Sequence, residues 1–599
     1  MLPLRDRGVD VGDEIMHGTG RRAQLRVGGG KLLIPLIEMV GKVVPRRIDP
    51  SLRLLQVRTR AHDRHNEADG GGDEQDGKEE ANRVHECAHD PKTVPAAKIE
   101  AAYPCLWQLQ PAGRAGDTAT RVGRRPGGTQ MARIVTIGGG VVGLCAAMLL
   151  ARDGHDVTVF ERDPAPAPDP DDAWDTWERR GVNQFRLLHF FQPRFRQIMD
   201  DNLPEVTQAF DAAGALRFNP LRDLPAEITG GFRDEDARFD AVTARRPVAE
   251  SAVARVAATI DQLEIRRGVA IAGLLTGEPS ASGVPHIIGV RTESGEDVHA
   301  DLVVDLGGRR SVLPKWLAEV GARAPIEEVA DCGFVYYGRH FRSPDGSSPF
   351  MMGPPLQDYG TFSTLTLPAD NGTWGVGIVT SARDTVLRAC KDADVYTRIV
   401  KSCPLVAHWL DGEPLDEKVA TMAKIEDRHR TFVVDGQPVA TGVAAVADAW
   451  ACTNPSVGRG ISIGMVHAVA LRDLMRDAPT DPIAFQHAWH EATLASAEPW
   501  YRTTMTFDEG RLGEIDALLD GREFEATPEY QELKAMLAAA GTHPDHLRAF
   551  LRVANVIDTP DEVLSDPELR ARIMEAGSAA SGAQLPGPSR DEVLAIVGS

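Results

Sequence analysis

The stretch at residues 132–163, ARIVTIGGGVVGLCAAMLLARDGHDVTVFERD, decides the fold. Its β-branched run Arg133–Ile137 predicts a buried strand, and Val141–Arg152 carries helix-forming residues with an apolar spacing close to 3.6. A second apolar run, Asp156–Phe160, predicts another strand that ends in Glu161. Strand, helix and strand in this order form one βαβ unit.

A glycine turn lies between the first strand and the helix, where residues 138–143 fit the pattern G-x-G-x-x-G. Gly138 permits the tight turn, Gly140 leaves room for a pyrophosphate, and Gly143 lets the helix pack closely on the strand. The start of the helix adds free N–H groups and the positive end of the helix dipole. We therefore predict dinucleotide contacts at Gly138, Gly140, Val141, Val142 and Gly143.

The second strand ends in an acid at the position where dinucleotide-binding folds recognise a ribose. Glu161 follows Gly140 by 21 positions, and an acidic side chain there accepts hydrogen bonds from ribose hydroxyls. An acid favours an unphosphorylated ribose, as in FAD or NAD. Strand, glycine turn, helix, strand and acid together indicate a bound dinucleotide rather than an empty turn.

A later stretch, ADLVVDLGGRRSVLPKWL at residues 300–317, repeats the strand-to-helix arrangement. It predicts a buried strand that ends in Asp305, a turn at Gly307 and Gly308, and a helix. By itself this pattern is equally typical of an ordinary connection without a ligand.

A third stretch, VAAVADAWACTNPSVGRGISIGMVHAVALRDLM at residues 443–475, adds a carboxylate and a further helix start. A short apolar strand leads to Asp448, a loop carries Pro455, and Gly458 and Gly460 open a long amphipathic helix. The carboxylate can accept bonds from ribityl hydroxyls. The positive end of the helix can stabilise the negative charge that a flavin pyrimidine ring gains on reduction.

These three motifs resemble the FAD-contacting motifs of the flavoprotein monooxygenases similar to p-hydroxybenzoate hydroxylase, and they follow the usual order. The resemblance covers about residues 132–475 and also includes RGVNQFRLLHFFQPRFRQIMDDNLPEV, ARRPVAESAVARVA and EIRRGVAIAGLL. It implies an FAD-dependent oxidoreductase. The further cofactor contacts that it implies are Glu161, Arg162, Arg186, Val269, Asp305, Gly307, Asp448, Pro455, Gly458 and Gly460, and it also points to Arg246.

The third motif departs from the family pattern in two places. Where the family usually reads Gly-Asp-Ala-Ala-His, residues 447–451 read Ala-Asp-Ala-Trp-Ala, and Arg459 stands where Gln is common. Asp448 preserves the cofactor carboxylate. The changes leave the flavin environment and the reaction type open.

The expected fold is α/β, with α+β character overall: a Rossmann-like FAD-binding domain, a β-sheet substrate domain and a helical C-terminal region. We assign the FAD-binding domain to residues 131–330 and 425–480, the substrate sheet to 331–424 and the helical region to 481–599. Within the substrate sheet, Tyr336, Tyr337, Arg339 and His340 are either substrate contacts or, with better support, an exposed strand face. The helical region either covers the flavin domain or mediates a dimer.

Residues 1–130 differ in kind from the remainder of the chain. They hold 21 Lys and Arg against 18 Asp and Glu, whereas residues 131–599 hold 45 against 69, and none of the 18 Phe precedes position 131. The segment NEADGGGDEQDGKEEAN has almost nothing to bury, which is typical of disorder. We interpret Met131 as the true start of the protein, with a disordered regulatory extension as the alternative.

HECAH at residues 85–89 lacks a fourth ligand at a recognisable spacing, so no metal site is predicted.

Composition narrows the class of protein. The net charge of −21 argues against a nucleic-acid partner. The apolar runs are too short or too interrupted for a transmembrane segment, and the seven scattered cysteines favour a reducing, cytoplasmic location. No second G-x-G-x-x-G appears, so NAD(P)H is expected to bind transiently as the electron donor, unless a partner flavin reductase delivers the electrons.

The leading functional hypothesis is an FAD-dependent monooxygenase, a hydroxylase or epoxidase, that acts on an apolar or aromatic small molecule. The alternatives are an FAD-dependent reductase of isoprenoid-type double bonds and a catalytically silent FAD-binding protein, the latter motivated by the sequence at residues 447–451. A flavin halogenase is disfavoured because no WxWxIP-like sequence is present. No catalytic residue is assigned, because this chemistry needs orientation and exclusion of water more than side-chain catalysis.

Overall fold

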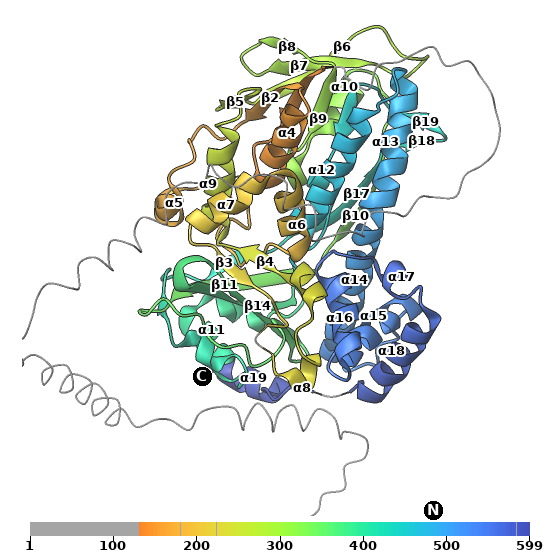
Figure 1. The fold of residues 1–599 in the computed structure, drawn as a ribbon. Coiled ribbons are helices and arrows are strands. Elements are labelled where there is room, and N and C mark those ends of the chain that lie inside the picture. The colour runs from red at the N-terminus through yellow and green to blue at the C-terminus, as the bar shows by residue number, and fades with distance from the viewer. Residues whose placement is uncertain (1–130, 180, 223, 583, 599) are drawn as a thin grey trace, which may run out of the picture. The chain divides into compact units, whose positions relative to one another are not determined.

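The βαβ unit forms with the expected boundaries, and it builds the centre of a five-stranded parallel sheet (Figure 1). A computed structural model describes residues 131–599 except 180, 223, 583 and 599, so the expectations for residues 1–130 lie outside the described residues. Helix α4 is Val141–Arg152. The sheet order is β20 (Val443–Ala445), β9 (Leu302–Asp305), β1 (Arg133–Ile137), β2 (Asp156–Glu161) and β5 (Leu263–Arg267), with all neighbours parallel.

Alternate residues of these strands pack into different cores, as the two-residue period of a strand requires. Ile134 and Val304 face the core that contains α4, whereas Val135 and Val303 face the opposite core. Both faces are therefore covered, which explains why the strand sequences are apolar throughout.

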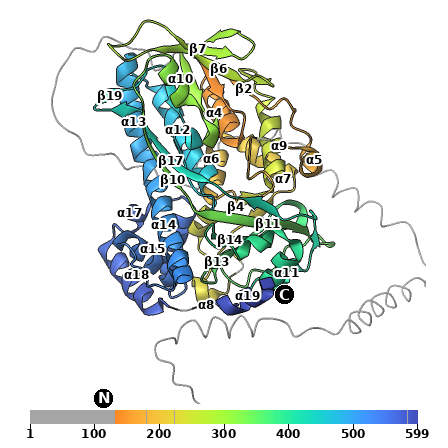
Figure 2. The ribbon, with the colours of Figure 1, turned by 180° about the vertical axis from the view of Figure 1, so that it is seen from behind.

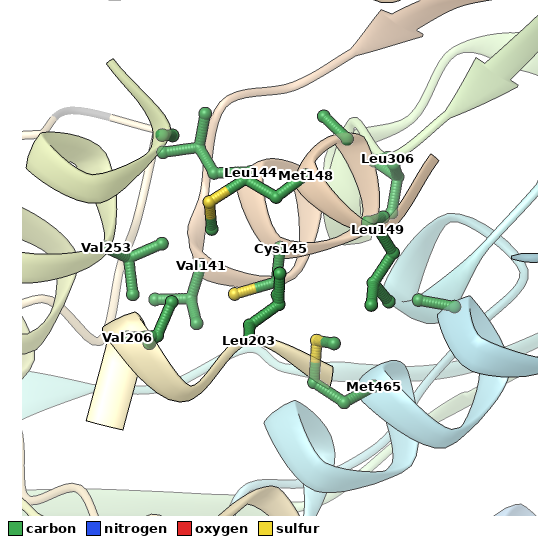
Figure 3. Packing of buried hydrophobic residues seen from close by; sticks show 14 of the residues in the cluster. Val141, Leu144, Cys145, Met148, Leu149, Leu203, Val206, Val253, Leu306 and Met465 are labelled. Atoms are coloured by element: carbon green, nitrogen blue, oxygen red, sulfur yellow. The ribbon is translucent and has the colours of Figure 1, made fainter. Parts of the chain in front are cut away.

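The core around α4 is formed by helices from distant parts of the chain, namely α6 (Pro193–Asn202), α7 (Pro204–Ala212), α9 (Arg246–Ala257) and α12 (Gly460–Arg476). Figure 3 shows Cys145 of α4 close to Leu203 and Met465, and Met148 belongs to the same core. The small residues of α4 let α9 and α12 approach it closely.

The opposite face is covered by the antiparallel sheet β6 (Ile271–Thr276), β7 (Ile287–Thr292) and β8 (Asp297–His299) together with α10 (Leu313–Glu319). A three-stranded sheet, β10 (Ile326–Asp331), β17 (Glu426–Thr431) and β21 (Ala451–Cys452), connects this part of the chain to the third motif. The fold class predicted from the sequence is confirmed.

The second large sheet is antiparallel and is formed by β12 (Leu356–Asp358), β13 (Phe362–Pro368), β14 (Thr373–Ser381), β11 (Phe334–Arg342), β15 (Glu413–Pro414) and β16 (Ala420–Met422). Helices α11 (Ala393–Lys401) and α19 (Arg590–Gly598) pack on one of its faces. Every residue of β14 is buried, so this sheet has no solvent-exposed face along its centre.

Glycines make the other face of this sheet flat where the segment after α5 (Pro170–Thr176) crosses it. Gly338 of β11 lies opposite Gly377 of β14 in the strand register. A Cβ at Gly375 would lie 2.4 Å from Leu188 Cγ, and one at Gly338 would lie 3.0 Å from Leu188 Cδ1. The glycines in the two strand sequences therefore serve the close approach of Leu188.

Helices follow α12 to the end of the described chain and are visible from both sides in Figures 1 and 2. They are α13 (Pro482–Ser496), α14 (Glu498–Asp520), α15 (Pro528–Ala539), α16 (Pro544–Ala554), α17 (Pro560–Val563), α18 (Pro567–Ala580) and α19. Thr559 caps α17 in a capping box with Glu562. After α18 the chain becomes helical again at Arg590.

A small hairpin and two short helices lie between α7 and α9 in the chain. The hairpin β3 (Leu216–Phe218) and β4 (Ala241–Thr243) is interrupted by α8 (Ala226–Thr229) and the 3₁₀ helix Asp234–Phe239. Arg548 of α16 is buried and pairs with Asp236 at 2.6 Å. The C-terminal helices are thereby fixed to the chain before α9.

Candidate flavin site

The three sequence motifs meet at one cavity of about 1060 Å³. Strands β1, β9 and β20 are parallel neighbours, so the turns that follow them lie at the same edge of the sheet. Fourteen of the fifteen predicted cofactor residues line the cavity: Gly138, Gly140, Val141, Val142, Gly143, Glu161, Arg162, Val269, Asp305, Gly307, Asp448, Pro455, Gly458 and Gly460.

The three motif glycines have different physical roles. Gly138 has φ +113°, and a Cβ there would lie 2.3 Å from the Leu306 carbonyl oxygen. A Cβ at Gly143 would lie 2.1 Å from the Gly138 carbonyl oxygen. Gly140 has φ −79°, and a Cβ would meet nothing within 4 Å. Gly138 and Gly143 are required by the fold, whereas Gly140 borders the cavity and leaves space for a ligand.

Glu161 is held by a buried arginine that sequence reasoning missed. Arg179 donates to Glu161 Oε2 at 2.5 Å and to Glu250 Oε2 at 2.5 Å, and all three side chains are at most 7% exposed. The Gly139 N–H also donates to Glu161 Oε2 at 2.9 Å. Arg179 orients the acid expected to bind the ribose. It lies 18 positions after Glu161 without any periodic relation, so the sequence carried no signal for it.

Asp305 is part of the turn that follows β9. Its Oδ1 accepts the Gly307 N–H at 2.9 Å, and its Oδ2 accepts the Ser311 hydroxyl. Burial raises the pKa of this carboxyl, against the lowering effect of these two hydrogen bonds. Asp305 therefore shapes the wall of the cavity by holding the turn between β9 and α10.

Asp448 is a carboxyl at the cavity wall that has no hydrogen-bond or ion-pair partner among residues 131–599 as described. Burial raises its pKa, while the positive charges of Arg309 and Arg246 oppose that rise. Both arginines also line the cavity. A carboxylate without a protein partner, in the electrostatic field of two cations, suits a ligand with several hydroxyl groups and a phosphate.

Ala447, in the position where the resembled family usually has Gly, adopts φ +54°. This left-handed conformation favours glycine, so the unusual alanine is accommodated at a cost of about 1 kcal/mol. The Ala447 N–H donates to Nδ1 of the fully buried His467 at 3.2 Å, and His467 Nε2 lies 3.0 Å from the Thr493 hydroxyl. These bonds hold the strained turn in place.

Arg186 does not line the cavity. It donates to the carbonyl oxygens of Trp174 and Trp177 and lies over the Trp174 ring, with its Cζ 4.7 Å from the ring centroid. Its contact with the cofactor remains a prediction. Arg246, which lines the cavity and pairs with Glu250 at 2.5 Å, is the better placed cation of that region.

The four polar residues of β11 divide into two pairs. Tyr336 and Tyr337 line the cavity, whereas Arg339 and His340 do not. All four are at most 9% exposed, so the interpretation as an exposed strand face is wrong. The reason is that the sheet is covered on both faces, by helices on one and by the segment around Leu188 on the other.

The cavity continues from the motif glycines to a region lined mainly by apolar side chains, which we call the apolar chamber. Its side chains come from the second sheet, the loop before β12 and the C-terminal helices: Met351, Leu356, Leu365, Leu367, Ile378, Met422, Phe507, Leu537, Phe550 and Leu551. The C-terminal helices therefore contribute to the cavity. Their participation had not been resolved from the sequence.

These features fit FAD. Gly140 leaves space beside the N-terminus of α4, Glu161 is oriented for a ribose, Asp448 offers free carboxylate oxygens, and Arg162, Arg246 and Arg309 bring positive charge. In the described part of the chain, no group of His, Cys, Asp and Glu side chains is arranged to hold a metal ion. Among the same residues, no helix combines the length and apolar character of a membrane span.

Residues 133–169 match the family model described as FAD dependent oxidoreductase. The match confirms the expected similarity of this nucleotide-binding unit to those of FAD-dependent oxidoreductases. A curated relative, Protein Rv3254 of Mycobacterium tuberculosis, is 31% identical over 228 residues. That alignment covers 35% of this chain and 45% of the relative, so the chain spans less than half of the protein it matches.

Several solved structures have a similar chain path. PqsL, a probable FAD-dependent monooxygenase from Pseudomonas aeruginosa, is 15% identical with a TM-score of 0.47, covering 65% of this chain and 100% of that one. OxyS anhydrotetracycline hydroxylase from Streptomyces rimosus is 17% identical with a TM-score of 0.47, covering 72% and 77%. The Diels-Alderase PyrE3 is 16% identical with a TM-score of 0.43, covering 76% and 82%. At these values the similarities do not select a reaction.

Proposed function

We propose that this protein is an FAD-dependent monooxygenase that hydroxylates or epoxidises an apolar or aromatic small molecule with electrons from NAD(P)H. One observation carries the proposal: the residues suited to FAD and the apolar chamber line the same cavity. A ligand in the chamber would therefore share one cavity with the bound cofactor and would be separated from it by no protein wall.

Bound FAD supplies the redox chemistry, including the activation of O2 after reduction. The protein binds the cofactor through the α4 N-terminus, Glu161 and Asp448, and it orients the substrate through the shape of the apolar chamber. Leu365, Ile378 and Phe507 keep water away from the chamber. Tyr336 and Tyr337 are the hydroxyl-bearing side chains of β11 at the cavity.

The apolar lining also indicates the kind of substrate. Its walls present carbon atoms of aliphatic and aromatic side chains, so polar substrates would lose hydration without compensating bonds. Lys534, the cationic side chain among the C-terminal residues that line the cavity, is paired with Glu514 at 2.6 Å. The chamber therefore favours a neutral ring system or alkene over an anionic substrate.

The test begins with the visible spectrum of the purified full-length protein, followed in the same cuvette by NADPH under air. We expect a flavin spectrum that bleaches and recovers while an oxygen electrode records consumption. A panel of aromatic and alkene compounds should then accelerate NADPH oxidation, with mass spectrometry detecting a product heavier by one oxygen atom.

Other outcomes separate the alternatives. Conversion of a substrate double bond to a single bond under anaerobic conditions would identify a reductase of double bonds. A flavin spectrum that neither NAD(P)H nor a flavin reductase changes would identify a silent FAD-binding protein. A colourless protein that does not bind added FAD would contradict the cofactor itself.

A further inference from the structure

A buried polar cluster lies behind the loop that carries Pro455. Asn454 and Ser456 of this loop line the cavity, and their side chains meet Asp508 of α14. Asn454 Nδ2 donates to Asp508 Oδ1 at 3.0 Å, and the Ser456 hydroxyl donates to the same oxygen at 2.9 Å. All three residues are at most 6% exposed. Asp508 lies beyond the part of the chain that carries the family resemblance.

The loop is fixed from two further elements. The Tyr336 hydroxyl of β11 donates to Asn454 Oδ1, and the Asn454 N–H donates to Asp427 Oδ1 of β17 at 2.6 Å. Asn454 therefore contacts α14, β11 and β17 at once. Its position sets the position of Pro455, which is a predicted flavin contact.

The surroundings of Asp508 are unfavourable to a negative charge. Its Oδ2 is buried and has no hydrogen-bond partner among the described residues, and both donors to Oδ1 are neutral. No ion pair within 4 Å links it to a cation of the described chain, although Arg459 acts on it from a greater distance. Asp427 is a second carboxyl that faces it, and Tyr336 and Cys332 are the other titratable groups nearby.

An ionised carboxyl in this environment would lack the solvation it has in water. The neutral acid keeps both hydrogen bonds to Oδ1 and removes the repulsion from Asp427. Burial and the neighbouring Asp427 accordingly raise the pKa of Asp508 well above its ordinary value.

We infer that Asp508 is a positioning residue that stays a neutral acid in the folded protein and holds the flavin-facing loop through Asn454 and Ser456. The inference rests on the flavin site proposed above. It assigns the helical C-terminal region a role in cofactor binding, since α14 also brings Thr503 and Phe507 to the cavity. Ionisation of Asp508 at high pH loosens the loop and weakens FAD binding.

The test compares the full-length protein with D508N and D508A by titrating apoprotein with FAD between pH 6 and pH 10. The asparagine side chain in D508N reproduces the shape and the acceptor oxygen of the neutral acid, so this variant should bind FAD as tightly as the native protein at pH 7. The native Kd should rise toward high pH, whereas the Kd of D508N should not. D508A removes the acceptor, which should weaken binding about tenfold at every pH.

Three results would overturn the inference: weaker binding by D508N at pH 7, native affinity in D508A, or the same alkaline rise in native protein and D508N. If D508A does not fold, S456A removes one of the two donors and should weaken FAD binding by a few-fold. Native affinity in S456A would then count against the positioning role.

A second readout does not need FAD. Urea unfolding of the apoproteins should show equal stability of native protein and D508N near pH 4. As the pH rises, the native protein should become less stable than D508N. The sign follows because the carboxyl of the unfolded chain ionises near its ordinary pKa while that of the folded protein stays protonated, so a rise in pH favours the unfolded state. If neither protein binds FAD but this difference appears, the proposed function fails while the neutral acid stands.

Discussion

Replacement of Gly140 by valine separates ligand binding from folding at this site. Gly140 has extended backbone angles, φ −79° and ψ −178°, which a β-branched residue adopts without strain. A Cβ there meets no protein atom within 4 Å. The added side chain extends into the cavity beside the α4 N-terminus, where we place the FAD pyrophosphate.

The magnitude follows from the bonds that the valine would prevent. Hydrogen bonds from backbone N–H groups to a charged phosphate contribute about 1.5–3 kcal/mol each. Loss of about two such bonds weakens FAD binding by about 3–6 kcal/mol, which is roughly 10²- to 10⁴-fold in Kd. The stability of the apoprotein should change by no more than about 1 kcal/mol, since Gly140 makes no side-chain cap.

Two measurements on the same samples check this expectation. Fluorescence titration gives the FAD affinity, and urea unfolding of the apoprotein gives its stability. Gly143→Ala is the matched control, because its Cβ would lie 2.1 Å from the Gly138 carbonyl oxygen. This control should destabilise the apoprotein by about 1–3 kcal/mol.

Full FAD occupancy in Gly140→Val would refute the placement of the pyrophosphate. A loss of several kcal/mol in apoprotein stability would refute the distinction between the three glycines. If Gly143→Ala instead left stability unchanged, the close packing of α4 on the turn would be incorrect.

Three further substitutions test the third motif. Asp448→Ala should weaken FAD binding by about 1.5–3 kcal/mol in the same titration, because a charge-assisted bond to the ribityl chain is lost; unchanged affinity would remove Asp448 from the site. Ala447→Gly should raise the free energy of unfolding by about 0.5–1 kcal/mol by relieving the positive φ, and a decrease would show that the turn is unstrained. Burial lowers the pKa of His467 from 6.5 to about 3, so the stability it contributes is present above pH 6.5 and is lost as pH falls toward 3. His467→Gln should therefore lose less stability than the native protein between pH 7 and pH 5 in urea unfolding, and equal losses would contradict the assignment.

Local pattern was sufficient for the nucleotide-binding unit. The boundaries of β1 and α4 follow from a short β-branched run and a helical apolar period, and the glycines between them have specific steric reasons. Such features depend on neighbours in sequence. The same holds for the Thr559 capping box, whose two partners are three residues apart.

The polar residues of β11 could not be assigned from the sequence. Polar side chains at Tyr336, Tyr337, Arg339 and His340 are compatible with exposure to solvent, and only the packing of helices and of Leu188 on the sheet buries them. The surroundings of Arg186 were likewise not evident from the sequence, because the carbonyl groups of Trp174 and Trp177, which bind its guanidinium, are 12 and 9 positions away in the chain.

The sequence by itself determined the βαβ unit, the three motifs and the resemblance to FAD-dependent oxidoreductases, because each depends on residues close together in the chain. Only the tertiary structure decided that Arg179 orients Glu161, that Asp508 reaches the loop at Asn454 from 54 positions away, and that the C-terminal helices complete the cavity. The physical reason is that a hydrogen bond or an apolar wall depends on distance in space. Side chains far apart in the chain become neighbours only when helices and sheets pack.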